Sequence, residues 1–135
     1  MSTKSRSKGT RAESEVVRYL QNWWPTAERR ALSGNKDKGD VAGIPGVVVE
    51  VKAAATQQLA AWTRETWIEM ENAEATCCVL VVKRPYKAAA QWDAYVPAHH
   101  LGGALLAALR NGEGAMLWLR MDLALAAAVL RNQGY

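Results

Sequence analysis

Several features that would mark other classes of protein are scarce in this sequence. It has two cysteines, Cys77 and Cys78, which are neighbours in an apolar run. Because adjacent residues of a strand point to opposite faces, we expect two buried thiols in a reducing compartment, and neither a disulfide nor a metal pair. The two histidines, His99 and His100, are also adjacent, and we expect them at the surface rather than as metal ligands.

Long apolar segments are missing as well. The N-terminus lacks the apolar core of a secretory signal, and no run approaches the roughly 18 apolar residues of a membrane-spanning helix. We therefore expect a soluble, cytoplasmic protein without a membrane partner. The 135 residues, half of them apolar, suit one domain with one core. Residues 1–8 are polar and basic, so we expect a flexible tail there and the domain in residues 9–135.

Acidic residues are outnumbered at the start of the chain. Residues 1–38 contain nine Lys or Arg and four Asp or Glu, whereas residues 39–135 contain eight and nine. The basic surplus therefore lies directly before residues 39–52, which contain Asp40 and Glu50. This uneven distribution favours a polyanionic partner.

What is present is a hairpin pattern in residues 39–52, which read Gly-Asp-Val-Ala-Gly-Ile-Pro-Gly-Val-Val-Val-Glu-Val-Lys. The pattern predicts a strand ending at Asp40, a turn near Pro45 and a second strand over residues 47–52. Since side chains alternate along a strand, Glu50 and Lys52 project to one face. A turn centred near Pro45 sets Asp40 opposite Glu50, at about 5 Å.

This group of side chains has a chemical use. Asp40 and Glu50 offer the hard oxygen ligands that Mg²⁺ prefers. A metal bound there can activate water and stabilise charge on a phosphodiester, and Lys52 can orient the water or stabilise the phosphorus centre. The alternative is a salt-bridged hairpin on a solvated sheet face.

A third acid lies on the first predicted helix, from about Arg11 to Trp24. Its apolar residues recur at helical spacing, and Glu13 falls on their buried face. Two explanations are open for an acid in that position. Glu13 can form a capping box with Thr10, or it can reach the metal as a third carboxylate.

The remaining pattern predicts an α/β domain. We expect a strand over residues 26–33, a polar connection over 34–38, and a helix over about 56–75 whose Glu69, Glu71 and Glu74 form a solvated face. Residues 77–82 predict a buried strand parallel to the preceding one. Further along we expect an edge strand over 92–96, a helix over 101–110, a strand over 115–121, and a last helix to about 132 capped by Asp122.

Basic residues gather in two places near the hairpin. One group lies before it and the other follows the buried strand, and both can hold phosphates of a nucleic acid or simply form solvated loops. The first group is Arg29, Arg30, Lys36 and Lys38, and the second is Lys83, Arg84 and Lys87.

The order of these motifs resembles the PD-(D/E)xK nuclease superfamily, with Glu13 on an N-terminal helix, then Gly39-Asp40, then Glu50-Val51-Lys52. More narrowly, residues 8–15, Arg29-Arg30 and residues 38–52 resemble Holliday-junction resolvases of archaea and phages. The similarity covers about residues 8–97. It implies a restriction-endonuclease-like α/β fold, with an αβββαβ core and a mixed central sheet flanked by helices. Gly39 stands where the superfamily motif has proline.

The resemblance also implies roles for individual residues. Glu13, Asp40 and Glu50 would be catalytic carboxylates that bind Mg²⁺, or Mn²⁺ in its place, together with the backbone carbonyl of Val51. Lys52 would be the catalytic lysine. Gln57 or Gln58 could take the place of a superfamily glutamine, and Arg29 or Arg30 that of a DNA-contacting arginine. The DNA-binding residues would be Lys8, Arg11, Arg29, Arg30, Lys36, Lys38, Gln57, Lys83, Arg84 and Lys87.

The activity that the resemblance implies is resolution of four-way DNA junctions. Cutting two opposed strands requires two sites at a fixed separation, so we expect a homodimer, joined through Trp23-Trp24 or the C-terminal helix. One alternative is a nuclease of the same fold that acts on nicked, flapped or linear DNA. The other is a DNA-binding protein that has the fold without the chemistry.

Overall fold

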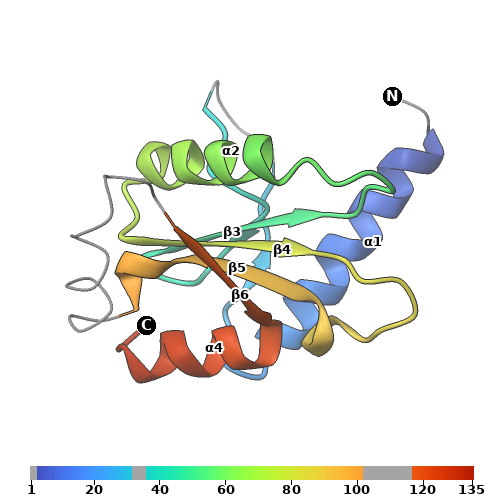
Figure 1. The fold of residues 1–135 in the computed structure, drawn as a ribbon. Helices are drawn as coiled ribbons and strands as arrows, with labels where there is room; N and C mark the ends of the chain where they lie inside the picture. The colour runs from blue at the N-terminus through green and yellow to red at the C-terminus, as the bar shows by residue number, and fades with distance from the viewer. Residues whose placement is uncertain (1–2, 32–35, 102–116) are drawn as a thin grey trace.

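The computed structural model describes residues 3–31, 36–101 and 117–135 (Figure 1). Its helices are α1 (Thr3–Leu20), α2 (Leu59–Asn72) and α4 (Leu123–Asn132). Its strands are β1 (Glu28–Arg29), β2 (Val41–Ala42), β3 (Val47–Lys52), β4 (Cys77–Val82), β5 (Asp93–Pro97) and β6 (Trp118–Asp122). Two short 3-10 turns, η1 (Ala89–Gln91) and η2 (Ala98–His100), flank β5.

The strands form one mixed sheet in the order β1-β2-β3-β4-β5-β6. β3 and β4 are parallel, and every other neighbouring pair is antiparallel. Helix α2 connects the two parallel strands, as strands that run in the same direction require. The predicted α/β class with a mixed central sheet is therefore confirmed.

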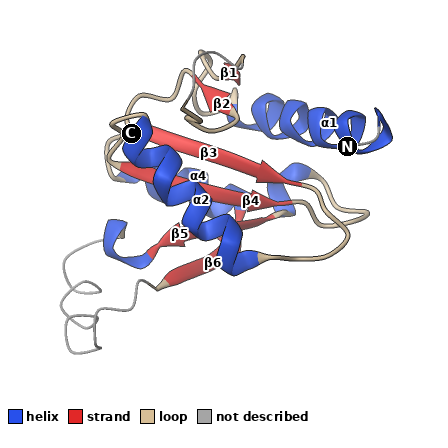
Figure 2. Cartoon of the chain, turned by 90° about the horizontal axis from the view of Figure 1, so that it is seen from above, coloured by secondary structure: helices blue, strands red, loops and turns tan. Residues whose placement is uncertain are grey.

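Helices cover both faces of the sheet (Figures 1 and 2). On one face, α1 and α4 pack on Val47, Val49 and Val51 of β3. On the other face, α2 packs through Met70 against Val48 of the same strand. The alternation predicted for residues 47–52 is thus present, with one difference. The face that carries Glu50 is not solvated, because α2 lies over it.

The middle of the sheet follows the sequence pattern closely. Residues 77–82 form a fully buried strand paired in parallel with β3, as expected. Cys77 and Cys78 are buried free thiols that pack on opposite faces of the sheet, so the predicted burial and alternation are confirmed. Burial raises the pKa of Cys77 to about 12, which makes this thiol unreactive at neutral pH.

The predicted edge strand is not at the edge. β5 lies between β4 and β6, and Pro97 is paired with Trp118. Its partner comes from a distant part of the chain, so the local pattern could not reveal it. Asp122 caps α4 as predicted, since its Oδ1 accepts a hydrogen bond from the N–H of Leu125 at 2.8 Å. The helix expected over residues 101–110 lies almost wholly outside the described residues.

The first helix is displaced from its predicted bounds. It begins at Thr3 and ends at Leu20, so residues 3–8, expected to be a tail, are helical. Thr10 therefore lies inside the helix and cannot act as its N-cap, and the Thr10–Glu13 capping box is wrong. In the described residues, no helix is both long and apolar enough to cross a bilayer.

Candidate functional site

The hairpin register brings Asp40 and Glu50 together. Val41 of β2 pairs with Val49 of β3, so one residue further along the same antiparallel register Asp40 faces Glu50. The N–H of Asp40 donates to the carbonyl oxygen of Val49 at 2.9 Å. Its Oδ2 accepts the N–H of Val51 at 2.7 Å. The predicted opposition is confirmed, although β2 begins after Asp40 instead of ending at it.

Gly39 makes this close approach possible. Its φ is +91°, in a region that side chains with a Cβ rarely adopt. A Cβ there would lie 2.7 Å from Cγ1 of Val48 and 3.1 Å from the carbonyl oxygen of Val49. Proline, with φ fixed near −65°, could not take this conformation. The backbone conformation therefore accounts for glycine rather than proline at position 39.

Lys52 lies on the same face as Glu50. Its Nζ is 3.9 Å from Oε1 of Glu50 and 3.1 Å from Oε2 of Glu65 on α2. Burial acts to lower the pKa of Lys52, but the surrounding carboxylates outweigh this effect and hold that pKa above its ordinary value. Lys52 is therefore a cation and a hydrogen-bond donor at neutral pH, and not a proton acceptor.

Glu13 reaches the site from α1. Its Oε2 accepts hydrogen bonds from Nη2 and Nε of Arg29, at 2.9 and 3.1 Å. Burial and the charge of Asp40 raise the pKa of Glu13, against the opposing effect of Arg29. Asp40 thus lies between Glu13 on one side and Glu50 on the other. Its ion pair with Arg29 joins α1 to β1 beside the site.

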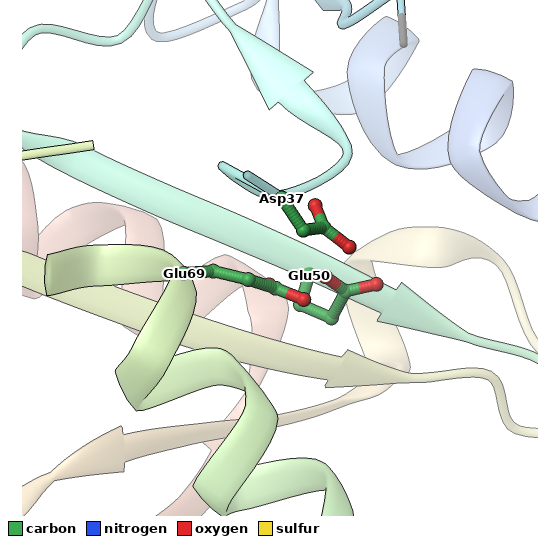
Figure 3. A group of neighbouring side chains, drawn as sticks. All are labelled: Asp37, Glu50 and Glu69. Atoms are coloured by element: carbon green, nitrogen blue, oxygen red, sulfur yellow. The ribbon is translucent and has the colours of Figure 1, made fainter. Parts of the chain in front are cut away.

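The most compact acid cluster differs from the predicted trio. Among the described residues, the carboxylates with oxygens all within 4.8 Å of one another belong to Asp37, Glu50 and Glu69. Figure 3 shows these three side chains turned toward one another from the loop before β2, from β3 and from α2. Glu13 and Asp40 extend the acidic region beyond this group. The site is therefore a chain of carboxylates with Glu50 in its middle.

Glu69 and Asp37 were missed in the sequence. Glu69 was expected on a solvated face, but it is 4% exposed, so that expectation is wrong. The signal was available, because Glu69 follows Trp62 by seven residues and Thr66 by three, which places it on their buried face. Asp37 sits in a polar connection between two lysines, and its sequence context gives no comparable sign.

Burial dominates the electrostatics of these acids. It raises the pKa of Asp40 to about 8, with a further contribution from Glu50. It raises the pKa of Glu50 to about 9, with Glu69 adding to the effect, and that of Glu69 to about 7. Grouped carboxylates of this kind must hold protons or be neutralised by a cation. Hard oxygen donors at this spacing fit a divalent metal ion.

The basic residues that follow β4 start at Lys83, which lies next to Lys52 at the end of β3. The N–H of Lys83 donates to the carbonyl oxygen of Lys52 at 2.9 Å, so the two loops leave the sheet at the same edge. Figure 1 shows both loops on the side where α1 begins. The Nζ of Lys83 lies 5.7 Å from the centroid of the Trp92 ring, while Arg84 and Lys87 are exposed.

The other predicted DNA contacts divide between the site and its surroundings. Arg29 is at the site through Glu13, whereas Arg30 is half-buried and lines a surface hollow beside the turn between β2 and β3. Of the two arginines, Arg29 is therefore the one that lies beside the carboxylates. The remaining predicted contacts are exposed, with Lys8 and Arg11 on α1, Lys36 and Lys38 on either side of Asp37, and both Gln57 and Gln58 before α2.

Comparisons of the chain with models of protein families, with curated proteins and with solved structures gave no match. The site itself offers three chemical resources. It has oxygen ligands from several elements, an ammonium group at Lys52 held near Glu50, and basic loops at the same edge of the sheet.

Proposed function

We propose that this protein is a metal-dependent endodeoxyribonuclease of the PD-(D/E)xK type that resolves four-way DNA junctions. The observation that carries the proposal is the register that sets Asp40 opposite Glu50, with Lys52 on the same face. Glu13 adds a fourth member of the motif, because it faces Asp40 although it is distant in sequence. A salt-bridged hairpin on a solvated face would not need the deep burial of Glu50, which is 5% exposed.

The chain's own residues can be given roles in hydrolysis. Asp40 and Glu50 would hold Mg²⁺, or Mn²⁺ in its place, with the carbonyl of Val51 beside them. When bound, the ion supplies an activated water and neutralises charge on the phosphate. The N–H of Val51 fixes the orientation of Asp40. Lys52, as a cation, donates a hydrogen bond to the attacking water or to a phosphate oxygen. Arg29 holds Glu13 in place from the outside.

The basic loops suit a phosphate backbone. Lys83, Arg84 and Lys87 leave the sheet next to Lys52, and Lys36 and Lys38 flank the acid cluster. Contacts of this kind position a duplex without reading its sequence. Recognition by backbone geometry is what a branched substrate of variable sequence requires.

Symmetric cleavage of a junction requires two active sites, so we propose a homodimer. Trp24 is 5% exposed and belongs to the core of the subunit, and Trp23 is partly buried against the same core, so this pair offers little apolar surface for a contact. Leu125, on the outer face of α4, is 53% exposed. Of the two surfaces that the sequence suggests, α4 is therefore the better candidate.

Cleavage of labelled DNA tests the proposal. A four-way junction and a linear duplex of equal length are incubated with the protein in Mg²⁺, in Mn²⁺ and in chelator. Paired symmetric nicks in the junction, present with metal and absent with chelator, are the expected result. The Asp40→Asn variant should bind the junction without cutting it, while Glu15→Gln, an exposed acid on α1, should cut normally.

Other outcomes identify the alternatives. Equal cleavage of linear duplex would replace the resolvase by a nuclease with a different DNA substrate. Binding of DNA without cleavage by the wild-type protein under any metal would show a DNA-binding protein on this fold. Cleavage that persists in chelator would exclude every metal-dependent version of the proposal.

A further inference from the structure

We infer that Asp37, Glu50 and Glu69 form a cation site of their own, which shares Glu50 with the Asp40 site and takes a second divalent ion. The three carboxylates come from the loop before β2, from β3 and from α2, and their oxygens all lie within 4.8 Å of one another (Figure 3). Two oxygens on one ion are at most twice the metal–oxygen distance apart, about 4.2 Å for Mg²⁺ and about 5 Å for Ca²⁺. The 4.8 Å bound lies within the Ca²⁺ limit and exceeds the Mg²⁺ limit by about 0.6 Å, so binding of Mg²⁺ would draw the three side chains slightly closer together.

Two buried oxygens point to a ligand at this place. Oε2 of Glu50 and Oε2 of Glu69 are inaccessible to solvent and have no hydrogen-bond partner in the described part of the chain. The side chains that face them are carboxylates, which can share a hydrogen bond only when one of them is protonated. Leaving buried polar atoms without a partner is costly. A cation would satisfy both oxygens at once.

The third ligand is held in position by the backbone around it. The N–H of Gly39 donates to Oδ1 of Asp37 at 2.9 Å. Nδ2 of Asn72, one turn beyond Glu69 on α2, donates to the carbonyl oxygen of Asp37 at 2.9 Å. Asp37 is itself exposed, so the cluster is closed by Glu50 and Glu69 inside and open to solvent at Asp37. The site therefore offers an ion three positioned ligands and a path of entry from solvent past Asp37.

The donor set identifies the class of ion. Three carboxylates and no described sulfur or imidazole ligand favour Mg²⁺, Mn²⁺ or Ca²⁺ over Zn²⁺ or Cu²⁺. Cation binding by Asp37, Glu50 and Glu69 does not depend on DNA cleavage. That this ion is the second of two rests on the proposed function, which places the other ion at Asp40 and Glu50.

Counting bound Mn²⁺ tests this inference. Mn²⁺ is titrated into the full chain without DNA, and free Mn²⁺ is followed by electron paramagnetic resonance. We expect two ions per wild-type chain. Glu69→Gln and Asp37→Asn should each lose one ion and keep the other. Asp40→Asn should keep the ion held by Asp37 and Glu69. Glu74→Gln, an exposed acid just beyond α2, is the control and should bind as wild type does.

Melting temperatures separate loss of binding from loss of folding. Without metal, Glu69→Gln should melt no lower than wild type, because the change removes one of three crowded carboxylates. Saturating Mn²⁺ should raise the melting temperature of wild type more than that of the variant. If Glu69→Gln does not fold, the same two melting temperatures are measured for Asp37→Asn, whose side chain is exposed.

Three results would overturn the inference. The first is unchanged Mn²⁺ binding by both Glu69→Gln and Asp37→Asn. The second is a single ion in wild type that Asp40→Asn alone abolishes, which would leave the proposed nuclease intact. The third is a single ion lost in all three variants, which would mean one enlarged site. Two ions in a protein that cuts no DNA would support the inference and contradict the proposed function.

Discussion

The carboxylates of Glu50 on β3 and Glu69 on α2 face each other between sheet and helix, and both side chains are almost completely buried. Within the ranges that the structure describes, Oε2 of neither side chain has a hydrogen-bond partner, and the ion pair of Lys52 is with Oε1 of Glu50. Such an arrangement is unfavourable when both groups are ionised. Protons or metal ions must therefore control the stability of this part of the molecule.

The first prediction concerns stability as a function of pH. The pKa values of Asp40, Glu50 and Glu69 are raised to about 8, 9 and 7, whereas those of unfolded acids lie near 4. Between these limits the folded state holds protons that the unfolded chain has released. The stabilisation is complete below about pH 4 and is lost as the pH rises through about 7 to 9.

Urea unfolding in chelator at intervals from pH 5 to pH 9 measures this effect. The free energy of unfolding should fall across the range, and Glu69→Gln should show a shallower fall. Saturating Mg²⁺ should oppose the loss at high pH, because the metal binds the ionised carboxylates. A free energy that rises between pH 5 and pH 9 without metal would contradict the burial of these acids.

The second prediction concerns the charge of Lys52. Lys52→Met keeps much of the side-chain length and removes the ammonium group, so kcat for junction cleavage should fall by about 10²–10³-fold. Binding of the junction should change little. Glu65→Gln removes the second acid next to Nζ and should leave cleavage largely intact. Normal cleavage by Lys52→Met would exclude a catalytic role for the lysine.

The third prediction separates the two roles of Glu13. Its ion pair with Arg29 is partly exposed, so breaking it in Glu13→Gln should cost about 1 kcal/mol at most. The variant should melt near the wild-type temperature and yet lose cleavage. Glu15→Gln on the same helix is the matched control for both measurements. Full activity of Glu13→Gln would restrict Glu13 to a structural ion pair with β1.

The fourth prediction concerns the backbone at Gly39. Gly39→Ala should destabilise the protein by about 1–3 kcal/mol, because φ is +91° and the new Cβ would meet Val48 and Val49. Asp40 would be displaced with it, so cleavage should fall more than stability alone explains. Gly9→Ala, inside α1 with nothing within 4 Å of the new Cβ, should be neutral or stabilising. Equal losses of stability in Gly39→Ala and Gly9→Ala would show that the backbone conformation and the close contacts at Gly39 have no special cost.

The fifth prediction concerns the basic loop after β4. Replacing Lys83, Arg84 or Lys87 by Gln should weaken junction binding at low salt. Each lost phosphate contact should also lower the slope of log affinity against log salt by about 0.9. Arg120→Gln, an exposed arginine on β6, is the control. Binding is measured by fluorescence anisotropy with Asp40→Asn as the background. A slope unchanged in all three loop variants would place the DNA elsewhere.

The sequence by itself determined the parts of this protein that depend on local periodicity. The alternation in residues 47–52 set Glu50 and Lys52 on one face, and the hairpin turn set the register that opposes Asp40 to Glu50. The buried strand over residues 77–82 and the helix cap at Asp122 were also predicted correctly from the sequence. Each follows from side-chain direction or backbone hydrogen bonding within a few residues.

Only the tertiary structure decided which distant groups meet. The packing of α2 on β3 buried Glu69 against Glu50 and brought Asn72 to the loop that carries Asp37. The placement of α1 beside β1 paired Glu13 with Arg29, a contact that the sequence did not predict, since it left Glu13 undecided between a metal ligand and a helix cap. These contacts join residues 16 to 35 positions apart. They depend on how whole elements pack, and no local pattern encodes that geometry.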